Sequence, residues 1–214
     1  MNLHADHSQR HVVDATDLIA GTPAERLLER RDRQERGCIR LRAEAAGASW
    51  RHDGQRLLEL LVVRGDVSVD GEALGPTSYV RLAPGTAVSL RTTKGCVLYV
   101  NERDPVEPET EAYAVQGDRL EWRPGMVPGL KVASLHQGLT RHTALVRWAP
   151  ETRFNPHTHV GGEEILVLDG VFRDEHGAYP AGTWIRSPHL SSHRPFTGPE
   201  GATILVKVGH LDVA

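Results

Sequence analysis

Short apolar runs separated by glycine and proline recur along the whole chain. The clearest are LLELLVV (57–63), CVLYV (96–100), EILVL (164–168) and ATILVKV (202–208), each about as long as a single strand. Outside residues 22–36, no long stretch shows the 3.6-residue period of an amphipathic helix. The pattern therefore predicts an all-β fold, a sandwich or barrel of antiparallel strands, rather than alternating strands and helices.

The second half of the chain repeats the first. One offset of 105 residues (164 − 59) aligns Leu41-Arg42 with Val146-Arg147, His52 with His157, Glu59 with Glu164, Gly65 with Gly170, and 79–81 with 184–186. A slip of one residue then aligns Gly95 with Gly201. Such self-similarity indicates two copies of one structural unit. We therefore predict a polar N-terminal segment (1–20), a first barrel (21–104) and a second barrel (105–214), with the seam in NERDPVEPETE (101–111).

The repeat also changes the interpretation of residues 26–36. Taken alone they look helical, but their counterparts, KVASLHQGLTRH (131–142), look like a strand, a turn and the start of another strand. We follow the repeat, because tertiary context overrides helix propensity. The run ERLLERRDRQER (25–36) has five arginines offset by four acidic residues, which predicts a solvated face rather than a basic patch.

Composition narrows the classes of partner. A formal charge of −3 gives no general attraction to nucleic acid, so none is expected as a partner. Without a membrane-length apolar run or a signal-peptide pattern, we expect no membrane association and a cytoplasmic location. Cys38 and Cys96 are predicted to be buried, reduced thiols. His4, His7 and His11 are assigned to a disordered polar tail rather than to a second metal site.

A cluster of potential metal ligands lies in NPHTHVGGEEILVLDG (155–170). Alternate residues of a strand point to the same face, so His157 and His159 present two imidazoles side by side. Val160-Gly161-Gly162 predicts a tight turn, which would place Glu163 across the ladder from His159. The alternative is a hydrogen-bonded polar cluster inside an empty barrel.

A further ligand is expected from GTWIRSPHLSSHRP (182–195), which offers His193 and His189. Three nitrogens and one oxygen suit a borderline divalent cation: Zn, Fe(II), Mn, Ni or Co. Glu164 has the opposite pleat parity to Glu163, which predicts a solvent-facing or ion-paired role. Tyr179 and Arg186 could line the cavity or serve the structure.

Residues 157–208, HTHVGGEEILVLDGVFRDEHGAYPAGTWIRSPHLSSHRPFTGPEGATILVKV, resemble the ChrR-like cupins, which are named for the metal-binding C-terminal domain of an anti-sigma factor. With the repeat, the resemblance implies two tandem cupin domains, each a small antiparallel β-barrel or jelly roll. It implies a metal held by His157, His159, Glu163 and His193, with His189 at the rim.

The same alignment gives the first barrel an incomplete set of ligands. His52, Gly54, Leu58 and either Ala87 or Val88 occupy the four positions. One ligand of four cannot hold a metal at useful affinity, so the first barrel is predicted to be metal-free.

Three classes of function stay open on the sequence. The resemblance implies a metal-dependent regulatory or small-molecule-sensing protein, with zinc favoured and Fe(II), Mn or Ni as alternatives. The zinc module through which that anti-sigma factor binds its sigma partner has no counterpart here, so sigma binding by that route is not expected. The second class is an Fe(II)-dependent cupin dioxygenase acting on β-diketones or thiols, and the third a non-redox metal-dependent isomerase, lyase or hydrolase. We expect a monomer or homodimer.

Overall fold

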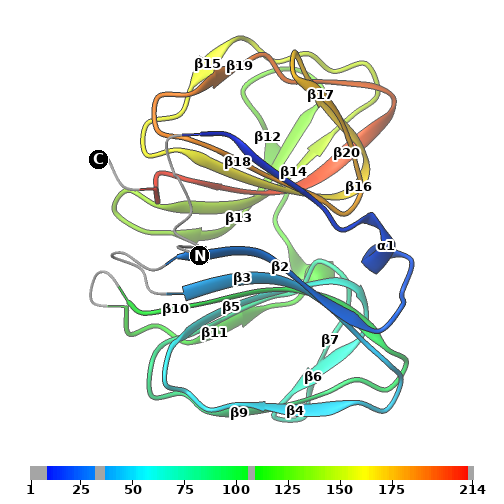
Figure 1. The fold of residues 1–214 in the computed structure, drawn as a ribbon, viewed down its shortest axis with the longest axis vertical. Helices are drawn as coiled ribbons and strands as arrows, with labels where there is room; N and C mark the ends of the chain where they lie inside the picture. Colours follow the sequence, from blue (N-terminus) through cyan, green and yellow to red (C-terminus); the bar gives the residue numbers. More distant parts are fainter. Residues whose placement is uncertain (1–8, 32–36, 106–108, 212–214) are drawn as a thin grey trace, which may run out of the picture. The chain divides into compact units, whose positions relative to one another are not determined.

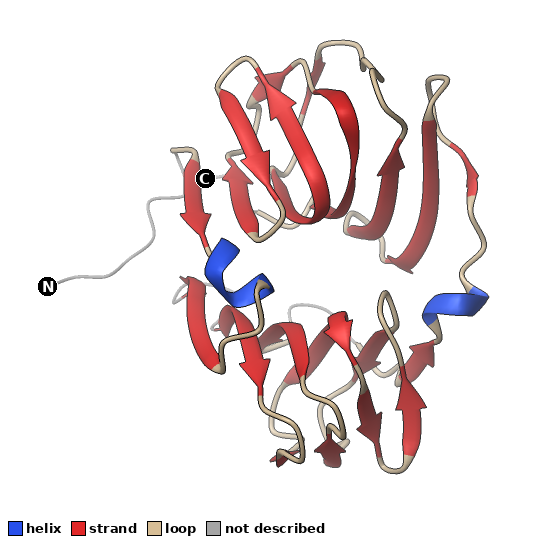
Figure 2. Cartoon of the chain, turned by 90° about the vertical axis from the view of Figure 1, so that its right-hand side faces the viewer, coloured by secondary structure: helices blue, strands red, loops and turns tan. Residues whose placement is uncertain are grey.

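The computed structural model describes residues 9–31, 37–105 and 109–211 (Figure 1). Their contacts divide them into two compact units, which we call the first unit (17–120) and the second unit (9–16 together with 121–211). Strands make up almost all of the regular structure (Figure 2), and every described pairing of strands is antiparallel. The predicted all-β fold is therefore confirmed.

The first unit contains two sheets. The larger has the strand order β11-β8-β5-β10-β3-β2, and the smaller has the order β4-β9-β6-β7. The elements are α1 (Thr16–Ile19), β2 (Ala24–Arg31), β3 (Gly37–Glu44), β4 (Ser49–His52), β5 (Leu57–Gly65), β6 (Val67–Val69), β7 (Glu72–Leu74), β8 (Tyr79–Leu82), β9 (Val88–Arg91), β10 (Cys96–Arg103), β11 (Tyr113–Val115) and the 3₁₀ turn η1 (Gly117–Arg119).

The second unit has one large sheet and one small one. The large sheet has the order β1-β18-β16-β20-β14-β13-β12, with β17 also paired to β16, and the small sheet consists of β15 and β19. The elements are β1 (His11–Asp14), β12 (Arg123–Pro124), β13 (Leu130–Gln137), β14 (His142–Trp148), β15 (His157–Thr158), β16 (Glu163–Asp174), β17 (Gly177–Pro180), β18 (Thr183–Ser187), β19 (Ser192–His193) and β20 (Phe196–Val208).

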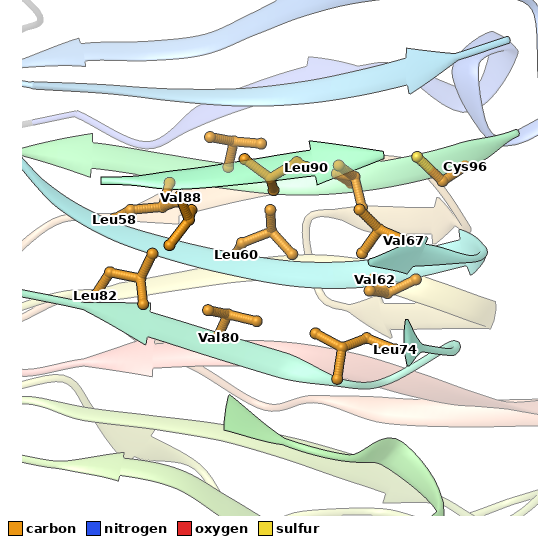
Figure 3. Close-up of a cluster of buried hydrophobic side chains, with 12 residues drawn as sticks. Leu58, Leu60, Val62, Val67, Leu74, Val80, Leu82, Val88, Leu90 and Cys96 are labelled. Carbon is orange, nitrogen blue, oxygen red and sulfur yellow. The ribbon is translucent and has the colours of Figure 1, made fainter. Parts of the chain in front are cut away.

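Each unit has an apolar core. In the first unit, leucines and valines at alternate positions of β5 point into one cluster, where they meet side chains of β8, β9 and β10 (Figure 3). This spacing of two is what a pleated strand requires to place side chains on one face. The core of the second unit is more aromatic, because Trp148, Phe172 and Tyr179 contribute to it.

The repeated glycines lie where the backbone comes closest to a neighbouring strand. Gly65 and Gly170 both have positive φ, 75° and 69°. A Cβ at Gly65 would lie 1.9 Å from the carbonyl oxygen of Gly95, and one at Gly170 would lie 2.3 Å from that of Gly201. Both positions therefore require glycine, which explains why the repeat preserves them.

Several sequence predictions are settled by the strands. Residues 24–31 form β2 rather than a helix, as the repeat indicated, and residues 32–36 lie outside the described part. The solvated face predicted for this run is partly wrong, because Leu28 and Glu29 are buried. Cys96 is buried and Cys38 half-buried, and both are free thiols.

The prediction of a disordered N-terminal tail is wrong for His11. That residue begins β1, which pairs with β18 through His11↔Arg186 to Asp14↔Thr183. Val12 and Val13 are β-branched residues, which favour an extended strand. His4 and His7 lie outside the described residues. In the part of the chain that the structure describes, no helix has the length and hydropathy to span a bilayer.

Candidate metal centre

Three neighbouring pieces of backbone bring the predicted ligands together in the second unit. His157 lies in β15 and pairs directly with His193 in β19. His159 follows β15, and Glu163 is the first residue of β16. The turn between them contains Gly161 and Gly162, both at positive φ, and is closed by the Gly162 N–H donating to the His159 carbonyl (3.2 Å).

The four side chains meet around one point. One potential ligand atom from each of His157, His159, Glu163 and His193 lies within 4.8 Å of the others. The Nε2 atoms of His157 and His159 are 3.0 Å apart. Oε2 of Glu163 lies 3.4 Å from Nε2 of His159 and 3.6 Å from Nε2 of His193. His157 is half-buried and the other three are buried.

The outward ring nitrogens have partners that leave the inward nitrogens as acceptors. Nδ1 of His157 faces the carbonyl of Asn155 (3.1 Å), and Nδ1 of His193 faces a carboxylate oxygen of Asp174 (3.3 Å). Because both partners only accept, these Nδ1 atoms carry the proton and each Nε2 presents a lone pair. Nδ1 of His159 contacts the Ser191 hydroxyl (3.1 Å), which can accept in the same way.

This arrangement fits a cation. Oε2 of Glu163 is buried and has no hydrogen-bond partner among the described residues. With the proton on Nδ1 of each histidine and with Glu163 ionised, imidazole lone pairs and a carboxylate oxygen converge with no hydrogen between them, which is costly unless a positive charge lies at the centre. Three nitrogens and one oxygen are a donor set that suits a divalent transition metal, so the cluster can hold one.

In the absence of metal, burial and the closeness of these groups shift their pKa values. Burial raises the pKa of Glu163 to about 7, against the lowering effect of His193 and Arg10. Burial, together with repulsion from His193 and His157, lowers the pKa of His159 to about 3. Burial also lowers the pKa of His157. The imidazoles of His157 and His159 are thus neutral at pH 7 and available as ligands.

Asp174 contacts the ring nitrogen of His193 that points away from the cluster. Its Oδ2 faces Nδ1 of His193 and accepts from Nη2 of Arg10 (2.6 Å). Its Oδ1 accepts from the Tyr179 hydroxyl (3.1 Å) and from the His176 N–H (2.9 Å). Although burial raises the pKa of Asp174, the hydrogen bonds from His193 and Arg10 hold it below its ordinary value.

Aromatic rings pack against the cluster. Phe154 meets His157 edge-on with ring centroids 4.9 Å apart, and Phe172 lies 6.1 Å from His193. Trp148 packs edge-on against both phenylalanines. These rings give the centre an apolar wall, which strengthens electrostatic interactions within it.

The predicted position of Glu163 in the ladder is wrong. Glu163 pairs with Ser187 and Val208, not with His159. β15 ends at Thr158, and the backbone of His159 instead bonds to Ser191 (N–H to carbonyl, 2.9 Å) and accepts from Leu190 (2.9 Å). The turn still brings the two side chains together, although they are not ladder partners.

The other predicted positions lie outside the four-residue cluster. His189 is half-buried, and its Nδ1 accepts from the Gly161 N–H (2.8 Å), so it braces the turn. Glu164 is buried rather than solvent-facing, with Oε1 3.0 Å from Nε2 of His210. Arg186 is buried opposite Glu164 in the ladder and shares its face of the sheet, away from Glu163.

The corresponding positions of the first unit are filled differently. His52 pairs with Val88, just as His157 pairs with His193, so the register selects Val88 over Ala87 as the fourth counterpart. Leu58 and Val88 both belong to the apolar core (Figure 3). Nδ1 of His52 contacts Glu102 (3.3 Å), and its Nε2 contacts the Arg56 carbonyl (3.1 Å).

Two contributors, Asp174 and Arg10, do not stand out in the sequence. Asp174 lies 19 residues before His193, and Arg10 lies 164 residues before Asp174. The only available signal was in the repeat, where Val69 stands at the position of Asp174 (174 − 105 = 69).

Comparison with known proteins agrees with this fold. The ChrR cupin-like domain model matches residues 110–212. A candidate glyoxylate-induced protein from Pseudomonas aeruginosa is 16% identical, with a TM-score of 0.74 over 95% of this chain and 91% of that one. YlbA from E. coli is also 16% identical, with a TM-score of 0.71 over 100% and 96%.

A salicylate 1,2-dioxygenase from Pseudaminobacter salicylatoxidans is 9% identical, with a TM-score of 0.69 over 98% of this chain and 87% of that one. None of the curated proteins compared with the chain matches it. At these identities the structural neighbours show the fold alone, whereas the domain model matches the residues that carry the cluster. The chain therefore has the cupin fold, and its residues 110–212 match the ChrR cupin-like domain.

Proposed function

We propose that the protein binds one divalent transition-metal ion in its second unit, through His157, His159, Glu163 and His193. The observation that carries this proposal is the buried Oε2 of Glu163, which faces imidazole nitrogens at 3.4 and 3.6 Å and has no hydrogen-bond partner in the described part of the chain. An unpartnered buried carboxylate oxygen is rare in native structures. A cation bound there gives the carboxylate a partner and removes the repulsion between the facing lone pairs.

The role that best suits this centre is regulation or sensing through a small molecule that binds at the metal. Four protein ligands leave at most two open positions on a six-coordinate ion. When bound, the ion supplies a Lewis acid for such a molecule and, if it is iron(II), an electron donor for oxygen. Among the cluster residues His157 is the one that is only half-buried, so we place the access route on its side.

The residues of the chain would orient and shield the bound molecule. Phe154 and Phe172 exclude water from two sides of the imidazole cluster. Asp174 holds the His193 ring, and His189 holds the turn that carries Gly161. Zinc is our first choice of ion for a sensing role, with Fe(II), Mn or Ni as the alternatives.

The direct test is metal stoichiometry. Protein purified without a histidine tag should contain close to one equivalent of a divalent metal per chain by elemental analysis, and the chelator-stripped form should rebind one equivalent of Zn²⁺. Glu163→Gln should abolish tight binding. His52→Gln is the matched control, because His52 is the counterpart of His157, and it should leave the stoichiometry unchanged. Wild-type protein that binds no divalent ion would refute the proposal.

A second candidate is an iron-dependent dioxygenase. The salicylate 1,2-dioxygenase among the fold neighbours favours this alternative at the level of the fold. Iron as the ion found in native protein, together with oxygen uptake on adding a β-diketone, a thiol or salicylate, would favour it over a sensor. Zinc in the native protein and no oxygen uptake by the iron-loaded form would exclude it. A non-redox isomerase or lyase would instead turn these compounds over without oxygen.

A further inference from the structure

The N-terminal segment reaches the metal centre through one side chain. β1 (His11–Asp14) pairs with β18 up to His11↔Arg186, and Arg10 is the next residue along. Continuing this register places Arg10 beside Ser187, whose other neighbour in the ladder is Glu163. Strand pairing therefore delivers the Arg10 guanidinium to the edge of the cluster, although its position in the sequence is remote.

The guanidinium contacts Asp174, which faces His193, and Tyr179, which donates to Asp174. Nη2 of Arg10 donates to Oδ2 of Asp174 at 2.6 Å and to the Tyr179 hydroxyl at 3.0 Å. Its carbon lies 5.4 Å from the centroid of the Tyr179 ring. The Asp174 side chain is fully buried, and that of Arg10 is 22% exposed. This is a largely desolvated, charge-assisted contact, of the kind that fixes geometry more strongly than an exposed ion pair does.

The oxygen that Arg10 binds is also the one that faces His193. Asp174 Oδ2 lies 3.3 Å from Nδ1 of His193, while Oδ1 is occupied by Tyr179 and His176. Each carboxylate oxygen therefore has two donors, which fixes the plane of the carboxylate. Without Arg10, Oδ2 would have only the His193 ring to orient it.

We propose that Arg10 is a positioning residue of the metal centre: it orients Asp174, and Asp174 in turn fixes the ring angle and the tautomer of His193. This inference rests on the proposed function, because it assigns Arg10 a role toward the same four ligands. Carboxylates that accept from a ligand histidine set the direction and basicity of its metal-binding nitrogen.

The first unit lacks this support as a set. At the offset of 105, Val69, Leu74 and Val88 stand at the positions of Asp174, Tyr179 and His193. Leu74 and Val88 are core residues there, and Val69 packs against the same core. A unit that has no fourth ligand thus also lacks the polar groups that would orient it, which associates the Asp174 carboxylate and the Tyr179 hydroxyl with the metal centre.

Two readouts test the role of Arg10. The first is Zn²⁺ affinity, measured by competition with a chromophoric chelator. Arg10→Met should weaken binding roughly tenfold, at the low end of the effect of removing an outer partner. Arg10→Lys keeps a charged nitrogen that can donate to both oxygens and should stay within about threefold of wild type. The second readout is the ¹⁵N spectrum of the His193 ring in metal-free protein, which should change from one Nδ1–H tautomer to a mixture in Arg10→Met.

The matched control is Arg173→Met. Arg173 precedes Asp174 on β16 but pairs with Glu200 (3.0 Å), so its loss should change neither readout. Arg10→Gln keeps an N–H donor without the charge and decides the question should the Met variant not fold. Wild-type affinity and an unchanged His193 spectrum in the folded Arg10 variants would overturn the inference. If wild-type protein binds no Zn²⁺, the proposed function fails, and the His193 spectrum alone decides the role of Arg10.

Discussion

The two units use the same strand register but place different side chains at the positions of the four-residue cluster. In the first unit the register pairs His52 with Val88, and in the second it pairs His157 with His193. The hairpin that pairs Val67 with Leu74 corresponds to the one that pairs Phe172 with Tyr179. The same strand arrangement therefore accommodates either apolar or titratable side chains at these positions.

The residues at these interior positions differ between the two units as a group. Leu58 and Val88 replace Glu163 and His193 together, and the remaining His52 has protein partners on both ring nitrogens. At Gly54, the counterpart of His159, a Cβ would lie 2.8 Å from the Ala87 nitrogen, so the backbone leaves no room for a histidine. A partly converted core would leave polar groups without partners, which is worse than either complete solution.

A carboxylate placed in the apolar core of the first unit should have the greatest effect on stability. Leu58→Glu should destabilise that unit by at least about 4 kcal/mol, because it buries a charge in an apolar cluster with no partner. It should not create a metal site, because Gly54 and Val88 supply no ligand. Urea denaturation measures the loss, and Leu58→Met, expected to cost less than about 1.5 kcal/mol, is the control. Tight binding of a second Zn²⁺ by Leu58→Glu would contradict this account.

The converse change makes the second unit resemble the first. Glu163→Leu should weaken Zn²⁺ binding by more than the roughly 100-fold that outer partners can produce, because it removes a direct ligand. The same change should stabilise the metal-free protein at pH 8 by about 1–3 kcal/mol.

The raised pKa of Glu163 explains why Glu163→Leu should stabilise the metal-free protein at pH 8. The contribution of Glu163 to stability is full below the ordinary pKa of the carboxyl and is lost as the pH rises through about 7. The gain from Glu163→Leu should therefore shrink at pH 5. Thermal unfolding with excess chelator at both values measures it, and wild-type protein that proves more stable than the variant at pH 8 would count against a strained carboxylate.

Acid should release the metal by way of Glu163 before His159. Because the pKa of Glu163 is about 7 and that of His159 only about 3, protonating the carboxylate should weaken Zn²⁺ binding about fivefold between pH 7 and pH 6. Chelator competition from pH 8 to pH 5 measures the slope. The weak binding that Glu163→Gln retains, measured against a weaker chelator, should show a shallower slope, and an equally steep one would assign the proton to another group.

The smallest expected effect is at His52. The bond to Glu102 raises the pKa of His52, so its contribution to stability is present below about pH 6.5 and is lost as the pH rises through the higher folded value. His52→Gln should lower stability by about 1 kcal/mol at pH 5.5 and by less at pH 8.5. Denaturation midpoints at the two pH values test this, and a larger loss at pH 8.5 would reverse the sign we assign.

The repeat predicted the two-unit fold, and residue spacing together with the family resemblance predicted the four-residue cluster. The residues that contact the cluster from outside depend on tertiary contacts. Gly65 and Gly170 are fixed by close backbone approach, so their spacing is visible in the sequence. The choice between Ala87 and Val88 needed the ladder register. Asp174 and Arg10 meet only because β1 pairs with β18, and no local pattern specifies that pairing.

The position of β1 at a sheet edge also affects whether the second unit can pair with other molecules. In the described strand order the second unit's large sheet ends with β1 on one side and β12 on the other, elements of four and two residues. Proline in β12 lacks an N–H, and short outermost strands offer little template for intermolecular pairing. Trimming the chain through residue 14 would uncover β18, whose buried TWIR run would then present open backbone groups to other molecules. A shortened protein should accordingly self-associate, whatever becomes of its metal.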